Sequence, residues 1–275
     1  MNPLIGQQLS ELYRAAANNN GQGKPMFRTE PFIPVSTRFG QFPECEVLLN
    51  HDDCEAFFQN VRHLEGTLDT DLQLFQKALA HLKKEGVRAF SFNIDLITAL
   101  HSDFAARACL IAIQEGFIEK SRIVLEITEH TAIPEGADLE VLAEMKKMGF
   151  KVALDDFDPF DPDMVERFGR LAPYADIIKF DHSVGERFSQ GEAELVLQTI
   201  RHYRAVYPDK VMVIEGVSEQ AMANKSSYVY AMRDAGIDVA QIYTPKVSQE
   251  RSYQAMVGSK PESSTAQQVW TPACA

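Results

Sequence analysis

The fold of this chain is decided by the stretch Phe150-Lys-Val-Ala-Leu-Asp155-Asp156-Phe157. The stretch follows Gly149, is mainly apolar and ends on two consecutive carboxylates before Phe157. A short apolar run bounded by glycine is typical of a strand that is buried on both faces. A buried carboxylate without a partner is costly in free energy. Either basic side chains or metal ions are therefore expected beside Asp155 and Asp156.

Strands and helices alternate on both sides of this stretch. Strands are predicted at residues 87–93, 122–126, 150–155, 175–180, 210–214 and 237–242, and helices follow them at 105–114, 139–148, 164–171, 192–207, 219–235 and 248–257. Such alternation predicts a parallel sheet with helices outside it.

The residues before this alternation predict a different start. Residues 3–18 have the apolar spacing of an amphipathic helix, and residues 18–25 have the composition of a linker. Two strands at 26–35 and 42–49, separated by a turn that contains Gly40, predict a hairpin, and residues 52–84 are expected to be helical. Eight strands in all are enough to close a TIM-like (β/α)8 barrel. The predicted organisation is an N-terminal helix and linker at 1–25, a barrel domain at 26–258 and a flexible tail at 259–275.

Composition narrows the class of function. The 275 residues have a formal net charge of −12, which argues against binding DNA through phosphate contacts. The four cysteines show neither a disulfide framework nor zinc-ligand spacing. No apolar run approaches the length of a membrane span, and the N-terminus has no signal-peptide pattern. These features predict a cytoplasmic protein without a membrane partner.

Nearly every predicted strand ends on a residue that can bind metal or phosphate. These residues are Glu46, Asn93, Glu126, Asp155 with Asp156, Lys179 with Asp181, Glu215 and Gln241. In a parallel barrel such ends converge on one face, where active sites are built. Carboxylates gathered there with one lysine would repel one another unless divalent cations were present. Their hard oxygen ligands suit Mg²⁺ or Mn²⁺, and Asp155-Asp156 could hold two ions close together.

At these residues the chain resembles the EAL family, phosphodiesterases of the bacterial second messenger cyclic di-GMP. Glu46-Val47-Leu48 resembles the family's signature tripeptide, with Val47 in place of alanine. The resemblance extends over residues 26–257. The later family motifs correspond to Asn93, Glu126-Ile-Thr-Glu129, Asp155-Asp156-Phe157, Lys179-Phe-Asp181, Glu215-Gly-Val217 and Gln241. The family fold is a barrel with one early antiparallel strand, as the hairpin also suggests.

The resemblance implies a role for each of these residues. Glu46, Asn93, Glu126 and Asp155 would hold one metal ion, and Asp155, Asp156 and Glu215 the second. Lys179 would lie close to the attacking water and the scissile phosphate, so Lys179, Glu215 and Glu46 are the expected catalytic residues. Glu129 would steady the loop after the Asp pair, while Asp181 and Gln241 would belong to the site and its loops. The implied reaction is hydrolysis of cyclic di-GMP to linear pGpG by water that two Mg²⁺ or Mn²⁺ ions activate.

Departures from the family pattern leave a second function open. Asn50 stands where active members have an arginine that contacts a ligand phosphate, which predicts weaker binding and slow turnover. Asp158-Pro-Phe-Asp-Pro-Asp163 replaces a glycine-containing loop that in the family couples the metals, the substrate and a homodimer. The alternative is an inactive EAL-like domain that senses cyclic di-GMP or acts through protein contacts. Hydrolysis of another phosphodiester is a third hypothesis, with less support.

Overall fold

The computed structural model describes residues 3–4, 6–7, 9–11, 25–38, 42–50, 54–218 and 228–243. All of them belong to one compact unit, residues 1–243. The described residues between positions 3 and 11 are helical, as predicted. The predicted turn at Gly40, the predicted helix at 248–257 and the predicted tail lie outside the described residues.

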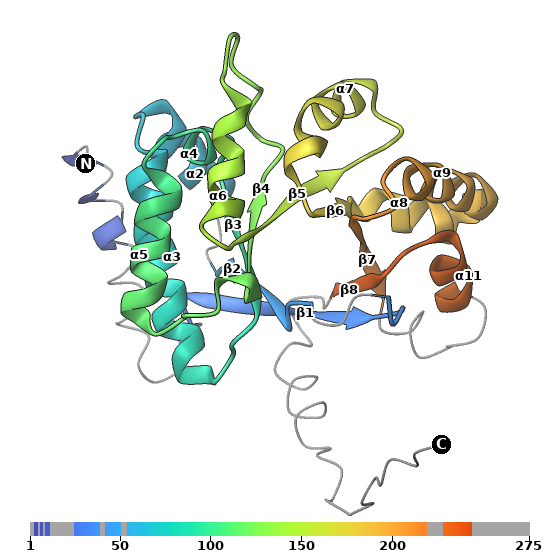
Figure 1. Cartoon of the computed structure of the whole chain (residues 1–275), viewed down its shortest axis with the longest axis horizontal. Helices are drawn as coiled ribbons and strands as arrows, with labels where there is room; N and C mark the ends of the chain where they lie inside the picture. The colour runs from blue at the N-terminus through green and yellow to red at the C-terminus, as the bar shows by residue number, and fades with distance from the viewer. Residues whose placement is uncertain are drawn as a thin grey trace, which may run out of the picture. The chain divides into compact units, whose positions relative to one another are not determined.

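Eight strands form a closed barrel in chain order (Figure 1). The strands are β1 (Phe27–Pro34), β2 (Cys45–Leu49), β3 (Phe90–Ile94), β4 (Ile123–Ile127), β5 (Lys151–Phe157), β6 (Ile177–Phe180), β7 (Val211–Ser218) and β8 (Val239–Tyr243). Strand β1 runs antiparallel to both of its neighbours, β2 and β8, while every other neighbouring pair is parallel. The predicted TIM-like barrel with one early antiparallel strand is confirmed.

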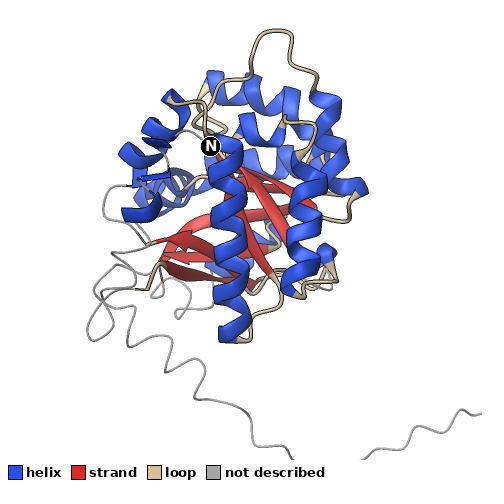
Figure 2. Cartoon of the chain, turned by 90° about the vertical axis from the view of Figure 1, so that its left-hand side faces the viewer, coloured by secondary structure: helices blue, strands red, loops and turns tan. Residues whose placement is uncertain are grey.

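Helices surround the strands (Figure 2). They are α2 (Cys54–His63), α3 (Thr67–Glu85), α4 (Leu96–Ala99), α5 (Phe104–Glu115), α6 (Leu142–Lys147), α7 (Pro162–Leu171), α8 (His182–Arg187), α9 (Ala193–Val206) and α11 (Tyr228–Ala235). Short 3₁₀ turns occur at Lys120–Arg122, Leu139–Val141 and Ala172–Tyr174, and a π-helical turn at Phe188–Glu192.

The continuous helix predicted at 52–84 is wrong. The chain forms two helices, α2 and α3, with a turn at Leu64-Glu65-Gly66 between them. Glu65 has a φ of 54°, a left-handed conformation that a helix interior does not tolerate. The apolar spacing continues across the turn because both helices pack against the barrel, which is why the spacing alone conceals the break.

Both faces of the sheet are buried. One face lines the inside of the barrel, and the other is covered by the helices. The outer face packs on the helices through large side chains such as Phe90, Phe157 and Phe180. A separate cluster fills the inside of the barrel, and we call it the apolar layer: Phe32, Val124, Ala153, Ile177, Val211, Val213 and Val239. Because successive side chains of a strand point to opposite faces, residues two positions from this layer also point inward.

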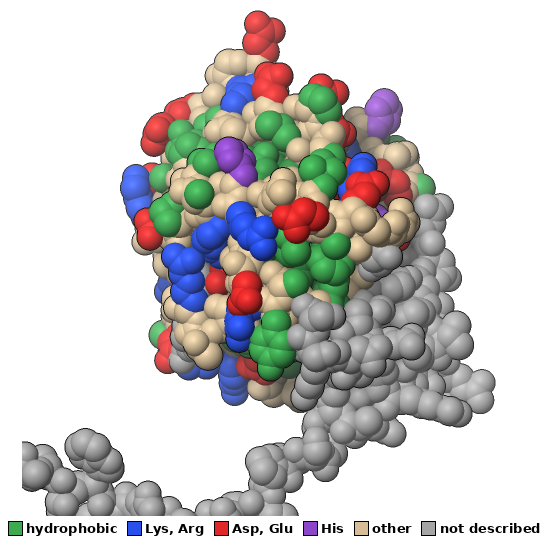
Figure 3. Space-filling model, turned by 90° about the vertical axis from the view of Figure 1, so that its right-hand side faces the viewer, with side chains coloured by type: hydrophobic (Ala, Val, Ile, Leu, Met, Phe, Trp, Pro, Cys, Tyr) green, Lys and Arg blue, Asp and Glu red, His purple; other side chains and the backbone are tan. Residues whose placement is uncertain are grey.

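The outer surface carries local charge pairs. On the face that includes α9, basic and acidic side chains lie beside one another over the described part of the chain (Figure 3). Arg201 lies 3.7 Å from Glu194, and Arg187 lies 3.2 Å from Glu192. Exposed pairs of this kind contribute little to stability or to a binding site. None of the described helices is both long and apolar enough to cross a lipid bilayer.

Candidate active site

A β-bulge at the carboxyl end of β5 presents the two aspartates. Leu154 pairs with Ile178 and Phe157 with Phe180, so β5 holds one more residue than β6 over this span. Asp156 takes up the extra residue with a φ of 50°, a conformation that aspartate adopts more readily than most residues. Both Asp155 and Asp156 therefore line the same cavity, although strict alternation would turn one of them away.

A second bulge lies at the same end of β7. Ile214 pairs with Ala240 and Val217 with Ile242, and the extra residue is at Glu215-Gly216. Gly216 has a φ of 69°, and a Cβ atom there would lie 2.8 Å from His182 Cβ. Helix α8 also approaches Glu215 itself, because a Cβ atom on Gly185 would lie 2.8 Å from the Glu215 carbonyl oxygen. The close packing of α8 thus fixes the position of Glu215.

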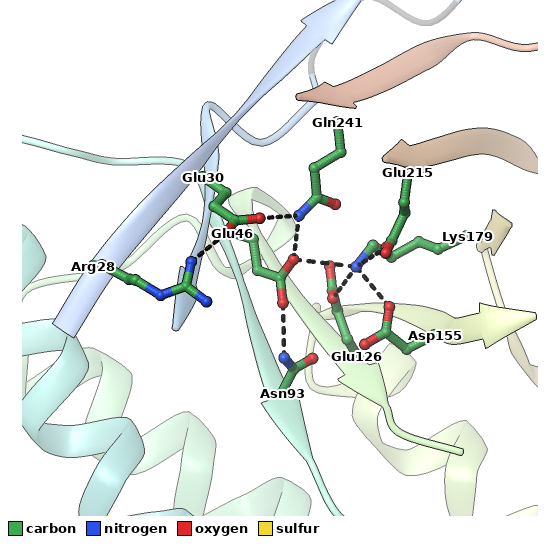
Figure 4. A network of polar contacts seen from close by, with 9 residues as sticks. All are labelled: Arg28, Glu30, Glu46, Asn93, Glu126, Asp155, Lys179, Glu215 and Gln241. Atoms are coloured by element: carbon green, nitrogen blue, oxygen red, sulfur yellow. Dashed lines mark hydrogen bonds and ion pairs between the residues drawn. The ribbon is translucent and has the colours of Figure 1, made fainter. Parts of the chain in front are cut away.

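Eight inward-facing polar side chains lie at this end of the barrel, directly beyond the apolar layer, and we call them the polar layer (Figure 4): Glu30, Glu46, Asn93, Glu126, Asp155, Lys179, Glu215 and Gln241. Glu30, Glu46, Glu126, Asp155, Lys179 and Gln241 are buried, and the other two are partly buried.

Lys179 is the centre of the polar layer. Its Nζ atom donates hydrogen bonds to Glu126 at 2.7 Å, Asp155 at 2.6 Å and Glu46 at 3.3 Å. It also lies 2.6 Å from Glu215 Oε1, which is not aligned for a hydrogen bond. Burial alone would lower the pKa of Lys179, but the surrounding carboxylates raise it well above its usual value. The ammonium group is therefore charged at neutral pH.

Two amides hold Glu46 in place. Asn93 Nδ2 donates to Glu46 Oε1 at 2.7 Å, and Gln241 Nε2 donates to Glu46 Oε2 at 2.6 Å. Gln241 Nε2 also lies 3.3 Å from Glu30 Oε2, so Gln241 connects β1 to β2 through their carboxylates. The Oδ1 atom of Asn93 is buried without a hydrogen-bond partner, which is costly unless another group contacts it.

The residues fit divalent cations. Five carboxylates (Glu46, Glu126, Asp155, Asp156, Glu215) and one ammonium would have a net formal charge of −4. Burial, followed by repulsion between carboxylates, raises the pKa values of Glu126, Asp155 and Glu215, and raises that of Asp156 to about 8. The carboxylates form two groups, and within each group the oxygen atoms lie within 4.8 Å of one another. One group is Glu46, Glu126 and Asp155, the other is Asp155, Asp156 and Glu215, and Asp155 belongs to both. These groups and the unpartnered Asn93 oxygen match the oxygen ligands of Mg²⁺, Mn²⁺ or Ca²⁺.

The polar layer opens into a cavity of about 520 Å³. The cavity is lined by Arg28, Glu30, Glu46, Leu48, Asn93, Asp155, Asp156, Lys179, His182, Glu186, Glu215, Gly216 and Gln241. Eight of the residues predicted from the sequence are thus brought together, since Glu126 contacts Lys179 just beneath this lining.

Three predicted residues, Asn50, Glu129 and Asp181, belong neither to the cavity lining nor to the polar layer. Asn50 Nδ2 donates to the backbone carbonyl oxygen of Pro25 at 3.0 Å. Asp181 is the N-cap of α8 and accepts a hydrogen bond from the Ser183 backbone N–H at 2.8 Å. Glu129 contacts His130 Nδ1 at 2.9 Å, and next to it Arg167 of α7 donates to the Thr128 carbonyl oxygen. The predicted roles of these residues in ligand or loop contacts stay predictions.

Four charged or titratable residues of the lining were not predicted from the sequence: Arg28, Glu30, His182 and Glu186. Arg28 pairs with Leu48 in the hairpin and lies two residues before Glu30, so the predicted hairpin register could have placed it on the inner face. His182 and Glu186 are four residues apart on α8, a helix too short to be recognised from apolar spacing.

The fold and this acidic cavity define the class of protein as a TIM-like barrel with a candidate metal site at the carboxyl ends of its strands. A family model described as the EAL domain matches residues 44–241. The chain belongs to the EAL family, as its sequence predicted. No curated protein sequence matches the chain significantly.

Solved structures share the fold at low sequence identity. The EAL enzyme Bd1971, solved with cAMP and cyclic di-GMP, has a TM-score of 0.61 at 15% identity over 87% of this chain and 65% of its own. The Xanthomonas citri FimX EAL domain, solved with cyclic di-GMP, has a TM-score of 0.59 at 15% identity over 87% and 92%. The PaMucR phosphodiesterase, in a cyclic di-GMP complex, has a TM-score of 0.60 at 17% identity over 85% and 94%. This chain therefore spans about two thirds of Bd1971 and nearly all of the other two.

Proposed function

We propose that the protein hydrolyses cyclic di-GMP to linear pGpG with the help of two divalent cations, Mg²⁺ or Mn²⁺. The observation that supports this most strongly is the pair of carboxylate groups that share Asp155 at the open end of the barrel. An inactive relative has no need to keep five carboxylates together, because their mutual repulsion opposes folding when no cation is bound. Membership of the EAL family, together with neighbours that contain cyclic di-GMP, supports this ligand.

Glu46, Asn93, Glu126 and Asp155 would hold the first cation, and Asp155, Asp156 and Glu215 the second. Bound there, the ions would lower the pKa of water and stabilise charge on the phosphoryl group. Asn93 and Gln241 fix the orientation of Glu46, and the packing of α8 fixes Glu215. These contacts hold the ligands in place before the ions arrive, so less reorganisation accompanies binding.

Lys179 would act as a charged hydrogen-bond donor. Its raised pKa keeps the proton on Nζ, so it is unsuited to removing a proton from water. From its position among four carboxylates, the ammonium group can orient the attacking water and stabilise negative charge on the phosphate in the transition state. Lys179 therefore orients water and stabilises charge in this proposal, while Glu46 and Glu215 act through the cations that they hold.

The direct test is incubation of the protein with cyclic di-GMP and Mg²⁺ or Mn²⁺, followed by chromatographic separation of the products. We expect pGpG to accumulate, and we expect EDTA or the substitution Glu46→Ala to stop its formation. Production of no more pGpG by the wild type than by Glu46→Ala would exclude the enzymatic function.

A second candidate is an EAL domain that binds cyclic di-GMP without hydrolysing it. Asn50 favours it, since a neutral amide provides no cation for the ligand and this amide already donates to the Pro25 carbonyl oxygen. Two aspartates of the altered loop also have structural contacts: Asp158 accepts from the Phe160 backbone N–H, and Asp161 is the N-cap of α7. Calorimetry separates the candidates, because binding without turnover supports a sensor and any turnover excludes one. A homodimer, a cytoplasmic location and the absence of DNA binding stay predictions.

A further inference from the structure

Arg28 differs from the other cation that lines the cavity. Lys179 is 1% exposed, and the carboxylates of the polar layer already engage its ammonium group. The Arg28 side chain is 26% exposed, and Glu30 is its ion-pair partner. Figure 4 shows Arg28 on one side of Glu46 and Lys179 with Asp155 on the other. Among the described residues of the lining, Arg28 is thus the cation best able to meet an anionic ligand.

Glu30 orients Arg28 without exhausting its donors. A guanidinium group has five N–H donors in a fixed plane, and the contact with Glu30 is made through Nη1. Glu30 is itself fixed by burial and by Gln241 Nε2. The remaining N–H groups of Arg28 can therefore form a bidentate contact with a phosphate, the geometry for which guanidinium is best suited.

The hairpin register relates Arg28 to Asn50. Arg28 pairs with Leu48, and the Asn50 backbone N–H donates to the Met26 carbonyl oxygen, so position 50 is opposite position 26. Residues opposite one another, and residues two apart, lie on the same face of a hairpin. Positions 28 and 50 are therefore diagonal neighbours in the hairpin, with position 50 one residue beyond the end of β2. A long side chain on either strand can reach the same region of the cavity.

We infer that Arg28 binds the phosphate of the cyclic dinucleotide that is not at the cations, and so supplies the guanidinium group that position 50 lacks. The inference rests on the proposed function, because it requires a ligand with a second phosphodiester. A cyclic dinucleotide carries two. One phosphate lies beside the carboxylate groups when cations are bound, and the other is left to meet the opposite side of the cavity. That side is where Arg28 lies.

The test measures the affinity of cyclic di-GMP for the full chain by calorimetry in Ca²⁺, with chromatography to verify that the ligand stays intact. Arg28→Ala is expected to weaken binding about 10- to 100-fold, the loss of a charge-assisted contact. Arg28→Lys should recover only part of it, because an ammonium group cannot make the bidentate contact. In Arg28→Ala combined with Asn50→Arg, the relocated guanidinium group should restore most of the affinity.

Two controls separate this contact from a change in the fold or in the cation sites. Arg88→Ala removes an exposed arginine just before β3, at the amino end of the strand, and should bind like the wild type. Thermal melts of Arg28→Ala in EDTA and in Mn²⁺ show whether the variant is folded and whether cations still stabilise it. Wild-type affinity in Arg28→Ala would overturn the role of Arg28 alone. If the wild type does not bind cyclic di-GMP at all, the proposed function falls and this inference falls with it.

Discussion

The inside of the barrel contains two layers, and along β4 to β8 they lie only two residues apart. The successive inward-facing pairs are Val124 and Glu126 on β4, Ala153 and Asp155 on β5, Ile177 and Lys179 on β6, Val213 and Glu215 on β7, and Val239 and Gln241 on β8. In β1 the order is reversed, with Glu30 before Phe32, because this strand runs in the opposite direction. The same strands thus present apolar side chains at one level of the barrel and polar, charged side chains at the next.

The two layers contribute oppositely to stability. The apolar layer consists of buried apolar side chains, so its burial stabilises the fold whether or not a cation is bound. The polar layer buries carboxylates whose raised pKa values show that their charge opposes folding. Its stability should therefore depend on cations, while that of the apolar layer should not.

The largest expected effect is the pH dependence of the metal-free protein. The carboxylates Glu126, Asp155, Asp156 and Glu215 have raised pKa values in the folded state, and that of Asp156 is about 8. Well below pH 4 these carboxyl groups are protonated in both the folded and the unfolded state, so they cause no penalty. As pH rises from 4 to 8, the unfolded chain releases protons first, so the free energy of unfolding should fall. Urea titrations in EDTA at pH 5 and pH 8 measure this fall. Saturating Mn²⁺ should remove it, and an equal slope with and without Mn²⁺ would contradict the account.

Lys179→Met should have the next largest effect. It removes the buried cation that pairs with the carboxylates of the polar layer. Breaking a buried ion pair by removing one partner costs about 3–5 kcal/mol. We expect this loss in the free energy of unfolding in EDTA at neutral pH, measured by urea titration, and a smaller loss in Mn²⁺. Turnover in Mn²⁺ should be abolished. Wild-type stability of Lys179→Met in EDTA would show that the ammonium group does not balance the cluster.

Ile177→Ala makes the matching change in the apolar layer of the same strand. The substitution should lower the free energy of unfolding by about 2–4 kcal/mol, through lost burial and the cavity that remains. Because no charge is involved, the loss should be the same in EDTA and in Mn²⁺. Denaturant titrations under both conditions measure it, and a loss that Mn²⁺ cancels would mean that the two layers are not separable.

Gly216→Ala should have the smallest effect on the polar layer, because it acts only through α8; its left-handed backbone alone costs about 1–2 kcal/mol. The added methyl group would also press on His182 and displace α8 from Glu215. We therefore expect weaker binding of Mn²⁺ as well as a lower melting temperature. Gly136→Ala is the matched control, because Gly136 also has a positive φ but has no atom within 4 Å of an added Cβ. Equal Mn²⁺ affinity in both variants would contradict the positioning role of α8.

Much of the polar layer could be predicted from the sequence because the carboxyl ends of parallel strands meet. Asn93, Glu126, Lys179 and Gln241 needed only the correct strands and the period of two. The hairpin brought Glu46 to the same face through the antiparallel pair of β1 and β2. Some predicted strand ends differ from the observed ends by one to four residues. These differences do not change the face on which the side chains lie.

The rest depended on local backbone irregularities that periodicity does not reveal. The bulges at Asp156 and Gly216 add a residue to one strand without altering its apolar pattern. The turn at Glu65 and the short helices α4 and α8 are too brief to have a spacing of their own. The position of Arg28 follows from pairing between strands, which composition cannot give.

The central claim is that the polar layer holds two cations that share Asp155. Isothermal titration calorimetry of Mn²⁺ into the metal-free protein is the most direct test. We expect two ions per chain for the wild type, weakened binding of one ion in Asn93→Ala and weakened binding of both in Asp155→Asn. No Mn²⁺ binding by the wild type, or wild-type binding by Asp155→Asn, would contradict it.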